Sequence, residues 1–463
     1  MLKARKAIVL ICTLPLLGAS MAEAHIDGDI LAVEEREGRQ QAVSAADPRA
    51  QAAGETILDQ GGSAVDAAIA VMLALTVVEP QSSGIGGGGF MLHGSREGDV
   101  LSYDGRETAP SHATDTWFLN PDGSLPDFRA SVESALSVGV PGNIKMAAMA
   151  HRQHGKLLWS ELFAPAIELA RNGYSMNQRL YDSIKVRSDF VAASEQAKSL
   201  YFDSHGEILP PGTIIQNPEL ADAFEIIASL GPDSFYQGAL ADQISRRVAR
   251  QTPEGTGIRL TDLRLYEAKI RDAVCGAYRG YRICSMGPPS SGGIAILQIL
   301  GHLERFDLRS LGVNNFTTWH LFLESQRLAY ADREIYIADP DFIPVPTEQL
   351  INANYLARRG ELISPIARRA IVEPGAPEGH ESSWADGLEP EEQGTSHFSV
   401  VDLEGNMVSY TSTIESAFGS GIMANGFFLN NELTDFSRIP EVNGLPVANR
   451  LEAGKRPRSS MAP

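Results

Sequence analysis

The tetrapeptide Gly394-Thr395-Ser396-His397 has the clearest chemical potential in this sequence. A threonine hydroxyl is a weak nucleophile unless a base lies beside it, and one solution uses the threonine's own α-amino group, freed when the preceding peptide bond is cut. The reference pKa of an α-amino group is about 7.7–8.0, so much of it can accept a proton near neutrality. Gly394 suits such a cut because it has no Cβ to keep the hydroxyl away from its carbonyl. By spacing alone, a Gly-Thr pair at the start of a strand is usually ordinary structure.

Thr395 lies where a polar segment meets a predicted hairpin. Residues 374–394 hold six acidic residues and no Lys or Arg, and such a stretch cannot bury enough apolar surface to order itself. We therefore expect an acidic flexible linker that could be cut without unfolding a core. Ser396–Val401 and Met407–Thr413 follow as two strands around a turn at residues 402–406.

The rest of the chain alternates helical and strand patterns, which predicts a mixed α/β (α+β) protein. We expect helices over residues 59–78, 143–172 and 316–338, and strands over residues 90–92 and 100–104. Residues 64–78 are apolar but are interrupted by Asp66, so we interpret them as a buried helix and not as a membrane span.

Residues 84–89 match the glycine pattern G-x-G-x-x-G. Dinucleotide binding requires a strand before that motif and a helix after it. Here the order is reversed, because a predicted helix precedes the glycines and strand-like residues follow them. A glycine-rich turn close to an active site, or a tight connection, fits better.

Composition excludes several classes of protein. The formal charge is −19, with 39 Lys+Arg against 58 Asp+Glu, whereas nucleic-acid binding requires clustered Lys and Arg. Apolar residues at 43% and charged residues at 21% are typical of a globular chain and not of a disordered one. No Cys/His cluster has metal-ligand spacing, so we expect no metal and no organic cofactor.

Residues 1–24 have the pattern of a signal peptide. Lys3, Arg5 and Lys6 precede an apolar run of residues 7–17, and a small-residue cleavage pattern ends at Ala24. The run is too short to span a bilayer. We therefore predict export to the periplasm, or secretion, with no membrane span after leader removal.

Two cysteines remain beyond the leader. Cys275 and Cys284 lie equidistant from a candidate turn at residues 278–281, so a two-residue hairpin would set them face to face. Export permits a disulfide, and two buried free thiols are the alternative.

Several sequence blocks, in the same order, resemble the gamma-glutamyltransferase family, whose members are precursors of the N-terminal-nucleophile hydrolase class. The resemblance runs from about residue 42 to the last residue. The matching blocks are Ala64-Val65-Asp66-Ala67-Ala68, residues 84–92, Asp104-Gly105-Arg106-Glu107-Thr108-Ala109-Pro110, Gly139-Val140-Pro141-Gly142, Pro288-Pro289-Ser290-Ser291-Gly292-Gly293, residues 395–402, Phe418-Gly419-Ser420-Gly421, Leu429-Asn430-Asn431 and residues 455–461.

The resemblance implies how the chain is divided and where the nucleophile lies. Thr395 would be both the self-cleavage residue and the catalytic nucleophile. A large-subunit region, residues 25–394, would then end at Gly394, and residues 395–463 would begin the small subunit. Thr413 would hydrogen-bond the hydroxyl or amine of the nucleophile.

Other matched residues would bind the head of the substrate. Arg106 would hold its α-carboxylate, which suits a planar and permanently charged side chain, although an arginine beside Glu107 is also typical of a solvated surface pair. Ser459 and Ser460 would donate further hydrogen bonds to that carboxylate.

Glu432 and Asp435 would receive the substrate's α-ammonium group. Positive charge at one end and negative charge at the other would select a free α-amino acid head and leave the γ-carbonyl to Thr395. At Glu415 the family commonly has Asn, so this sequence adds a negative charge that bears on the preferred acyl group.

The implied fold is a four-layer αββα sandwich, with two sheets packed between helices. The family continues after Met461 with a Gly-Gly pair that forms the oxyanion hole, whereas this chain ends at Pro463. We therefore expect a C-terminally truncated fold with an incomplete small subunit. The stretch between Ser437 and Lys455 is also shorter than in lid-bearing members of the family.

The implied reaction is a two-step acyl transfer. Thr395 would take the γ-glutamyl group of a small glutathione-like substrate, and an amino acid or water would accept it. Two alternatives remain open: a related acylase of the glutaryl or cephalosporin type, and a non-catalytic exported amino-acid-binding fragment.

Overall fold

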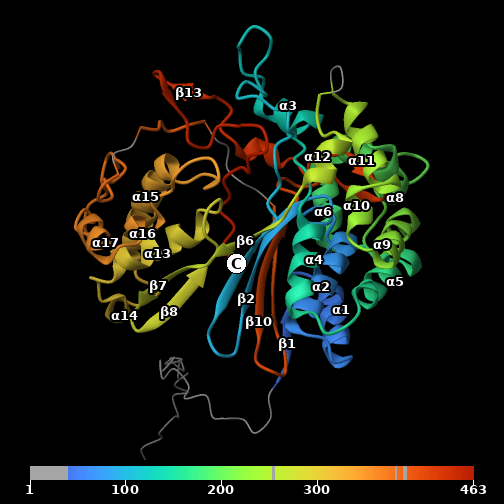
Figure 1. The fold of residues 1–463 in the computed structure, drawn as a ribbon, viewed down its shortest axis with the longest axis horizontal. Helices are drawn as coiled ribbons and strands as arrows, with labels where there is room; N and C mark the ends of the chain where they lie inside the picture. The colour runs from blue at the N-terminus through green and yellow to red at the C-terminus, as the bar shows by residue number, and fades with distance from the viewer. Residues whose placement is uncertain (1–39, 253–255, 381–382, 389–393) are drawn as a thin grey trace, which may run out of the picture. The chain divides into compact units, whose positions relative to one another are not determined.

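A six-stranded antiparallel sheet lies at the centre of the computed structural model, which describes residues 40–252, 256–380, 383–388 and 394–463 (Figure 1). The predicted leader, residues 1–24, lies outside the described residues. The strands run in the order β1-β9-β10-β2-β3-β6. Their bounds are Ala42–Ser44 (β1), Ser396–Val401 (β9), Met407–Thr413 (β10), Gly88–Gly94 (β2), Val100–Asp104 (β3) and Lys269–Asp272 (β6).

The period-2 pattern of these strands determines which face is buried. Phe398 and Val400 of β9, and Val408 and Tyr410 of β10, lie in the main hydrophobic core, whereas the intervening Ser399 is exposed. The β9–β10 hairpin and β3 have the bounds predicted from the sequence, and β2 extends the predicted strand at residues 90–92 in both directions.

A layer of helices covers the core face of the sheet. Helix α2 (Ala64–Val78) is buried along its whole length and contacts β9 and β10. Around it lie α1 (Pro48–Asp59), α4 (Asn143–His154) and α5 (Ala164–Asn172) (Figure 1). No helix of the described residues is long and apolar enough to cross a membrane. Every residue of α2 is buried, which confirms the interpretation of residues 64–78 as a buried helix.

Two predicted helices differ in the structure. The helix expected over residues 59–78 begins only at Ala64, because α1 ends at Asp59 and Gly61 has a positive φ of 87°. Ser63 is the N-cap of α2 and accepts a hydrogen bond from the Asp66 N–H. The helix expected over residues 143–172 is divided at Gly155 into α4, a 3₁₀ turn at Trp159–Phe163, and α5. The third, α15 (Phe316–Tyr336), is confirmed over most of its predicted range.

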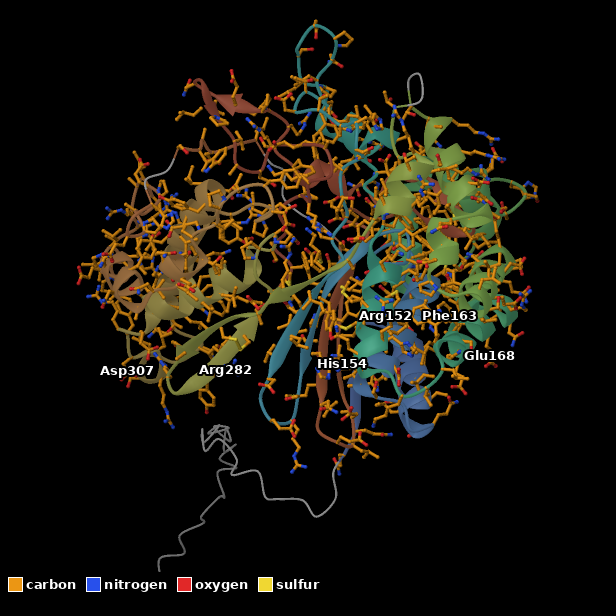
Figure 2. The ribbon with its side chains drawn as sticks, viewed as in Figure 1. Arg152, His154, Phe163, Glu168, Arg282 and Asp307 are labelled. Carbon is orange, nitrogen blue, oxygen red and sulfur yellow. A yellow bond between two sulfur atoms is a disulfide. The ribbon has the colours of Figure 1, made fainter. Side chains whose placement is uncertain are left out.

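Two stacked histidines, buried His93 and half-buried His154, lie between the sheet and this helix layer. His154 at the end of α4, labelled in Figure 2, stacks on His93 of β2 with ring centroids 3.7 Å apart. The Tyr103 hydroxyl lies 2.7 Å from His154 Nε2. Burial, followed by the neighbouring His154, lowers the pKa of His93 to about 4.

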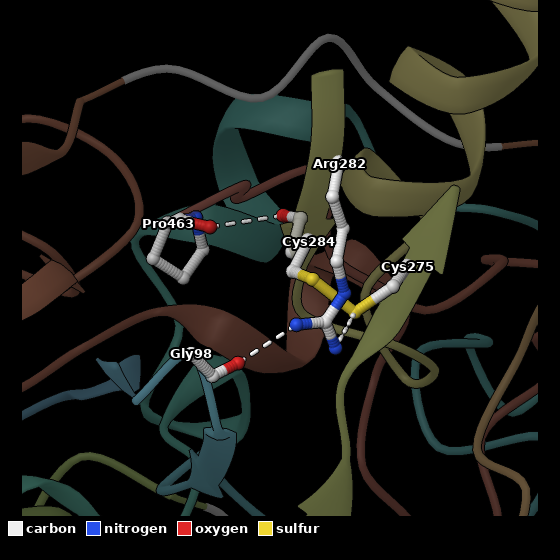
Figure 3. Close-up of a disulfide and its surroundings, with 6 residues drawn as sticks. Gly98, Cys275, Arg282, Cys284 and Pro463 are labelled. Carbon is white, nitrogen blue, oxygen red and sulfur yellow. Dashed lines mark hydrogen bonds between the residues drawn. A yellow bond between two sulfur atoms is a disulfide. The ribbon is translucent and has the colours of Figure 1, made fainter. Parts of the chain in front are cut away.

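A second group of helices packs on a hairpin. Strands β7 (Val274–Tyr278) and β8 (Tyr281–Ser285) pair with Cys275 opposite Cys284, and the two sulfurs form a disulfide (Figure 3). Helix α13 (Gly292–Leu303) contacts both strands, and α15 and α17 (Ala353–Gly360) contact α13. Of the two alternatives for the cysteines, the structure has the disulfide.

The hairpin is also joined to two distant segments. Arg282 donates a hydrogen bond to the Gly98 carbonyl at 2.7 Å, and Ser285 donates one to the Pro463 carbonyl at 2.9 Å (Figure 3). The α+β class is confirmed by these elements. Among the described residues, the central sheet is the only one with more than two strands.

The described parts of the acidic segment, residues 374–380 and 383–388, contain no helix or extended strand. They are held at several points, since the Gly375 N–H donates to Asp332 and Ala385 forms an isolated bridge with Val447. Residues 381–382 and 389–393 of the predicted linker lie outside the described residues.

The remaining elements connect these groups. The helices are α3 (Phe128–Val132), α6 (Gln178–Val186), α7 (Ser188–Ala192), α8 (Glu195–Tyr201), α9 (Pro218–Leu230), α10 (Asp233–Tyr236), α11 (Ala239–Ala249), α12 (Leu260–Leu265), α14 (Leu308–Leu311) and α16 (Thr347–Leu350). Short 3₁₀ turns lie at Ala135–Ser137 and Glu432–Asp435. Two-residue strands pair as β4 (Tyr174–Ser175) with β5 (Ile214–Ile215), β11 (Met423–Ala424) with β12 (Phe427–Phe428), and β13 (Glu441–Val442) with β14 (Leu445–Pro446).

Candidate active site

Thr395 immediately precedes β9, and its side chain turns back on the peptide bond before it. Its hydroxyl donates a hydrogen bond to the Gly394 carbonyl at 2.6 Å. Gly394 has a φ of 92°, a left-handed conformation that L side chains rarely adopt. An added Cβ there would lie 2.6 Å from the Glu415 carbonyl oxygen. A glycine is therefore required both by the backbone conformation and by its neighbour.

Thr413, the last residue of β10, lies beside the same peptide bond. Its hydroxyl donates to the Gly394 carbonyl at 2.9 Å and accepts a hydrogen bond from the Glu415 N–H at 2.8 Å. The Thr395 hydroxyl lies 3.4 Å from the Thr413 hydroxyl. A hydroxyl that donates to a carbonyl draws charge toward its oxygen, so this arrangement can stabilise an oxyanion formed on Gly394.

Arg106 lies two residues beyond the end of β3 and is fully buried. Its guanidinium forms ion pairs with Glu432 and with Asp435, the latter at 2.5 Å. It also donates to the carbonyl oxygens of Pro457 at 3.1 Å and Arg458 at 2.9 Å. The positive and negative groups predicted to bind opposite ends of a substrate head thus face each other directly.

Local contacts fix the backbone of Arg106. Its N–H donates to the Asp104 carboxylate at 2.9 Å, and its carbonyl accepts from the Tyr266 hydroxyl at 2.8 Å. Asp104 is itself paired with Arg271 at 2.7 Å and Arg456 at 3.3 Å. This buried ionic network fixes the end of β3 and, through it, the guanidinium.

Glu415 is buried and has a positive φ of 71°. Its carboxylate accepts hydrogen bonds from the Ser416 hydroxyl at 2.5 Å and from the Asn431 side-chain amide. Asn431 directly precedes the 3₁₀ turn at Glu432–Asp435, so the same polar network joins the end of β10 to the two acidic residues.

These residues enclose one small cavity of about 10 Å³. Gly394, Thr395, Thr413, Arg106, Glu415, Glu432, Asp435, Ser459 and Met461 line it. Eight residues predicted for the site, from five separate segments, therefore meet together with Met461, although Ser460 is not among the lining residues. Because a volume of this size holds about one water molecule, a larger ligand requires the ion pairs to open.

The glycine-rich turn packs directly against this cavity's walls. A Cβ on Gly86 would overlap the Phe428 carbonyl, and one on Gly87 would overlap the Thr413 carbonyl. Helix α2 precedes the turn and strand β2 follows it, which is the order opposite to a dinucleotide site. The glycines therefore allow close backbone packing beside Thr413.

Comparisons with known proteins agree with this geometry. The sequence profile of the family Gamma-glutamyltranspeptidase matches residues 50–463. This chain belongs to the gamma-glutamyltranspeptidase family. It is similar to the glutathione hydrolase proenzymes of Escherichia coli (strain K12) and Bacillus subtilis (strain 168), at 38% identity with each. Each match covers 92% of this chain and 72% of the relative.

Solved structures place the fold among N-terminal-nucleophile hydrolases. Gamma-glutamyltranspeptidase from Helicobacter pylori is 36% identical with a TM-score of 0.70, covering 74% of this chain and 97% of that one. A cephalosporin acylase from Bacillus halodurans is 28% identical with a TM-score of 0.77, covering 92% of this chain and 74% of that one. The chain is thus a member of an enzyme family of γ-glutamyl hydrolases and transferases.

Sequence reasoning overlooked several residues of this transpeptidase-family site. Glu107 was interpreted as part of a possible surface pair, yet it is completely buried beside Arg106. Asn431 and Tyr266 hold Glu415 and the Arg106 backbone by hydrogen bonds. Glu107 and Asn431 lie inside blocks that resemble the family, so that resemblance could have identified them, whereas no sequence signal pointed to Tyr266.

Proposed function

We propose that this protein is a self-cleaving precursor whose Thr395 becomes the nucleophile of a γ-glutamyl hydrolase and transferase. The observation that carries the proposal is the convergence of two hydroxyls on one carbonyl: Thr395 at 2.6 Å and Thr413 at 2.9 Å from the Gly394 oxygen. The charged groups that could select an amino-acid head line the same cavity.

In the first step, Thr395 Oγ1 attacks the Gly394 carbonyl carbon while Thr413 donates to the carbonyl oxygen. The peptide C–N bond breaks, the hydroxyl proton passes to the released Thr395 nitrogen, and the acyl group moves to Oγ1, so that an ester replaces the amide. Water then hydrolyses the ester. Gly394 gains a free carboxylate, and Thr395 gains a free α-amino group that can act as its base.

In the second reaction, that amine takes the Thr395 hydroxyl proton as Oγ1 attacks the γ-amide carbonyl of the donor. The amine of the donor leaves with a proton, and a γ-glutamyl ester remains on Thr395. Arg106 is positioned to hold the α-carboxylate of the donor, and Glu432 with Asp435 its α-ammonium group. Water as acceptor gives hydrolysis, and an amino acid gives transfer.

Cleavage is tested on a denaturing gel. The wild-type protein should run as two pieces, with Thr-Ser-His-Phe at the start of the smaller one, and Thr395→Ala should remain one piece. Thr413→Ala should be cleaved slowly. The matched control is Thr411→Ala, which should be cleaved normally. Thr411 lies on the same strand as Thr413, and its hydroxyl lies 2.8 Å from His397 Nδ1. An active wild-type protein that stays uncleaved contradicts the proposal.

The acylase alternative is supported by the structural similarity to a cephalosporin acylase. The electrostatics favour the γ-glutamyl donor, because Glu415, Glu432 and Asp435 line one cavity with a single guanidinium. A glutaryl group has no ammonium to place against three carboxylates. Turnover of γ-glutamyl and glutaryl p-nitroanilides should therefore favour the γ-glutamyl compound, and equal or faster glutaryl release would favour the acylase.

Export and subunit division are part of the same proposal. Residues 1–24 would act as a signal peptide that directs the chain to the periplasm or to secretion, and the cut before Thr395 would give two subunits from one precursor. The intact mass of the natural protein tests leader removal and the cut together. Glutamate binding without turnover, measured by calorimetry, would instead indicate a binding protein.

A further inference from the structure

Glu107 is a buried carboxyl group to which the reaction above assigns no role. Its side chain is completely buried, and an ideal Cβ on Gly88 would lie 2.5 Å from its Oε2. Neither oxygen accepts a hydrogen bond from any residue that the structure describes. An ionised carboxylate in such a place has lost its hydration with no donor to replace it, which is strongly unfavourable.

The nearest hydroxyl groups do not supply a donor. Tyr236, Tyr266 and Tyr410 are buried near enough to Glu107 for its charge to affect their own pKa values, all of which are raised, chiefly by burial. Each hydroxyl donates its proton to another oxygen, at 3.0, 2.8 and 2.8 Å respectively. Their protons are therefore committed elsewhere.

The charged groups that act on Glu107 are Arg106, Glu432 and Asp435, and a side-chain hydrogen bond with Glu432 is one of the influences on the Glu107 pKa. Two carboxylates cannot hydrogen-bond to each other, since both are acceptors only, but a carboxyl and a carboxylate can. Arg106 is a single positive charge that already pairs with two carboxylates. Among these described groups the two carboxylates already outnumber the guanidinium, and a third ionised carboxylate would double the excess negative charge.

We propose that Glu107 keeps its proton at neutral pH and donates it to Glu432, acting as a positioning residue that holds the Glu432 carboxylate toward the substrate's ammonium group. This role rests on the proposed γ-glutamyl site. Glu107 is then a titrating group that lies behind the substrate-binding residues and does not contact the substrate.

The direction of the pKa agrees with this arrangement. Burial raises the pKa of Glu107 to about 8, with Arg106 opposing the shift. Above that pH, Glu107 loses its proton, repels Glu432 and adds charge to the cluster. We therefore expect kcat/KM to fall on the alkaline side with an apparent pKa near that value, mainly through KM, because the free enzyme loses the arrangement that receives the ammonium.

Glu107→Gln is the decisive variant, because its amide is neutral at every pH and still donates to Glu432. At pH 7 the kcat/KM of Glu107→Gln should lie within about threefold of the wild-type value. The alkaline decrease in kcat/KM should be lost, apart from any decrease caused by the ammonium group of the substrate itself. Glu107→Leu, which has no donor, should raise KM at all pH values. Glu79→Gln is the matched control, because Glu79 is also buried and has a raised pKa but pairs with Arg179. The Glu79→Gln variant should keep the alkaline decrease in kcat/KM.

Infrared spectroscopy provides a test that requires no turnover. The natural protein labelled with ¹³C-glutamate should show a protonated carboxyl band at pH 7 that disappears near pH 8, and Glu107→Gln should lack it. This result can be obtained even if γ-glutamyl activity is absent, so the two proposals fail separately. An unchanged alkaline decrease in Glu107→Gln, or the absence of any carboxyl band that titrates in this range, overturns the inference.

Discussion

Replacing Gly394 by alanine tests whether the backbone before Thr395 is set up for cleavage. At a φ of 92° an L residue costs about 1–2 kcal/mol, and here its Cβ would also lie 2.6 Å from the Glu415 carbonyl oxygen. The contact is with backbone, so either Gly394 or the end of β10 must shift. A shift moves the carbonyl away from the two hydroxyls that converge on it, and a misplacement of this kind can cost about 100-fold in rate.

Gly379 supplies a matched control in the same acidic segment. It has a φ of 74°, and nothing lies within 4 Å of an ideal Cβ there. Gly379→Ala therefore has the energetic cost of an L residue at positive φ, but its Cβ makes no close contact. In a pulse-chase experiment followed on denaturing gels, Gly394→Ala should mature about 10- to 100-fold more slowly than the wild type, which corresponds to about 1.4–2.7 kcal/mol in the barrier. Gly379→Ala should mature at nearly the wild-type rate.

Two results would refute this reasoning. If Gly394→Ala matures as fast as the wild type, the close approach to Glu415 does not set the geometry of the cut. If both variants are equally slow, the positive φ alone is responsible and the contact has no role. Circular dichroism of each variant shows whether slow maturation reflects a folding defect.

Four further outcomes follow from the structure. Arg106→Lys keeps the charge but loses the planar fork, so kcat/KM for the γ-glutamyl donor should fall about 10- to 100-fold, mainly through KM; an unchanged KM would contradict its role. Glu415→Gln removes one of three carboxylates, so the ratio of γ-glutamyl to glutaryl turnover should fall; a rise would reverse the electrostatic argument. Replacing Cys275 and Cys284 together by serine should lower the free energy of unfolding by about 2–3 kcal/mol, measured in urea, because the disulfide closes a short loop of nine-residue separation. The His93 pKa of about 4 lies below its usual 6.5, so the unfolded chain binds the proton more readily than the folded protein does. The free energy of unfolding should therefore fall as the pH drops from 6.5 toward 4. His93→Gln should reduce that loss by at most about 3 kcal/mol, measured in unfolding curves at each pH.

The strands around the nucleophile could be predicted closely because their signals are local. The β9–β10 hairpin and β3 have strong alternation and end at clear turn residues, so their predicted bounds match the structure. The helix expected over residues 59–78 was wrong at its beginning. The prediction included the polar and glycine residues 59–63, but the capping of α2 by Ser63 places the start of the helix after them.

The site itself could be predicted as a set of residues but not as an arrangement of charges. The residues that resemble the family do meet at one cavity, apart from Ser460, although they come from distant parts of the chain. Sequence could not show that Glu432 and Asp435 pair directly with Arg106, because that depends on how the 3₁₀ turn at Glu432–Asp435 folds back toward β3. Nor could it show that Glu107 is buried, since an acidic residue beside an arginine is usually solvated.

The order of strands in the central sheet constrains how the chain can be made. Val43 of β1 pairs with Val400 of β9, 357 positions later, and β10 must lie between β9 and β2. During synthesis on the ribosome, β1 and β2 therefore emerge long before the strands that separate them. Contacts so distant in sequence form slowly, so the sheet cannot close, and the bond before Thr395 cannot reach its reactive geometry, until the chain has been translated beyond Thr413.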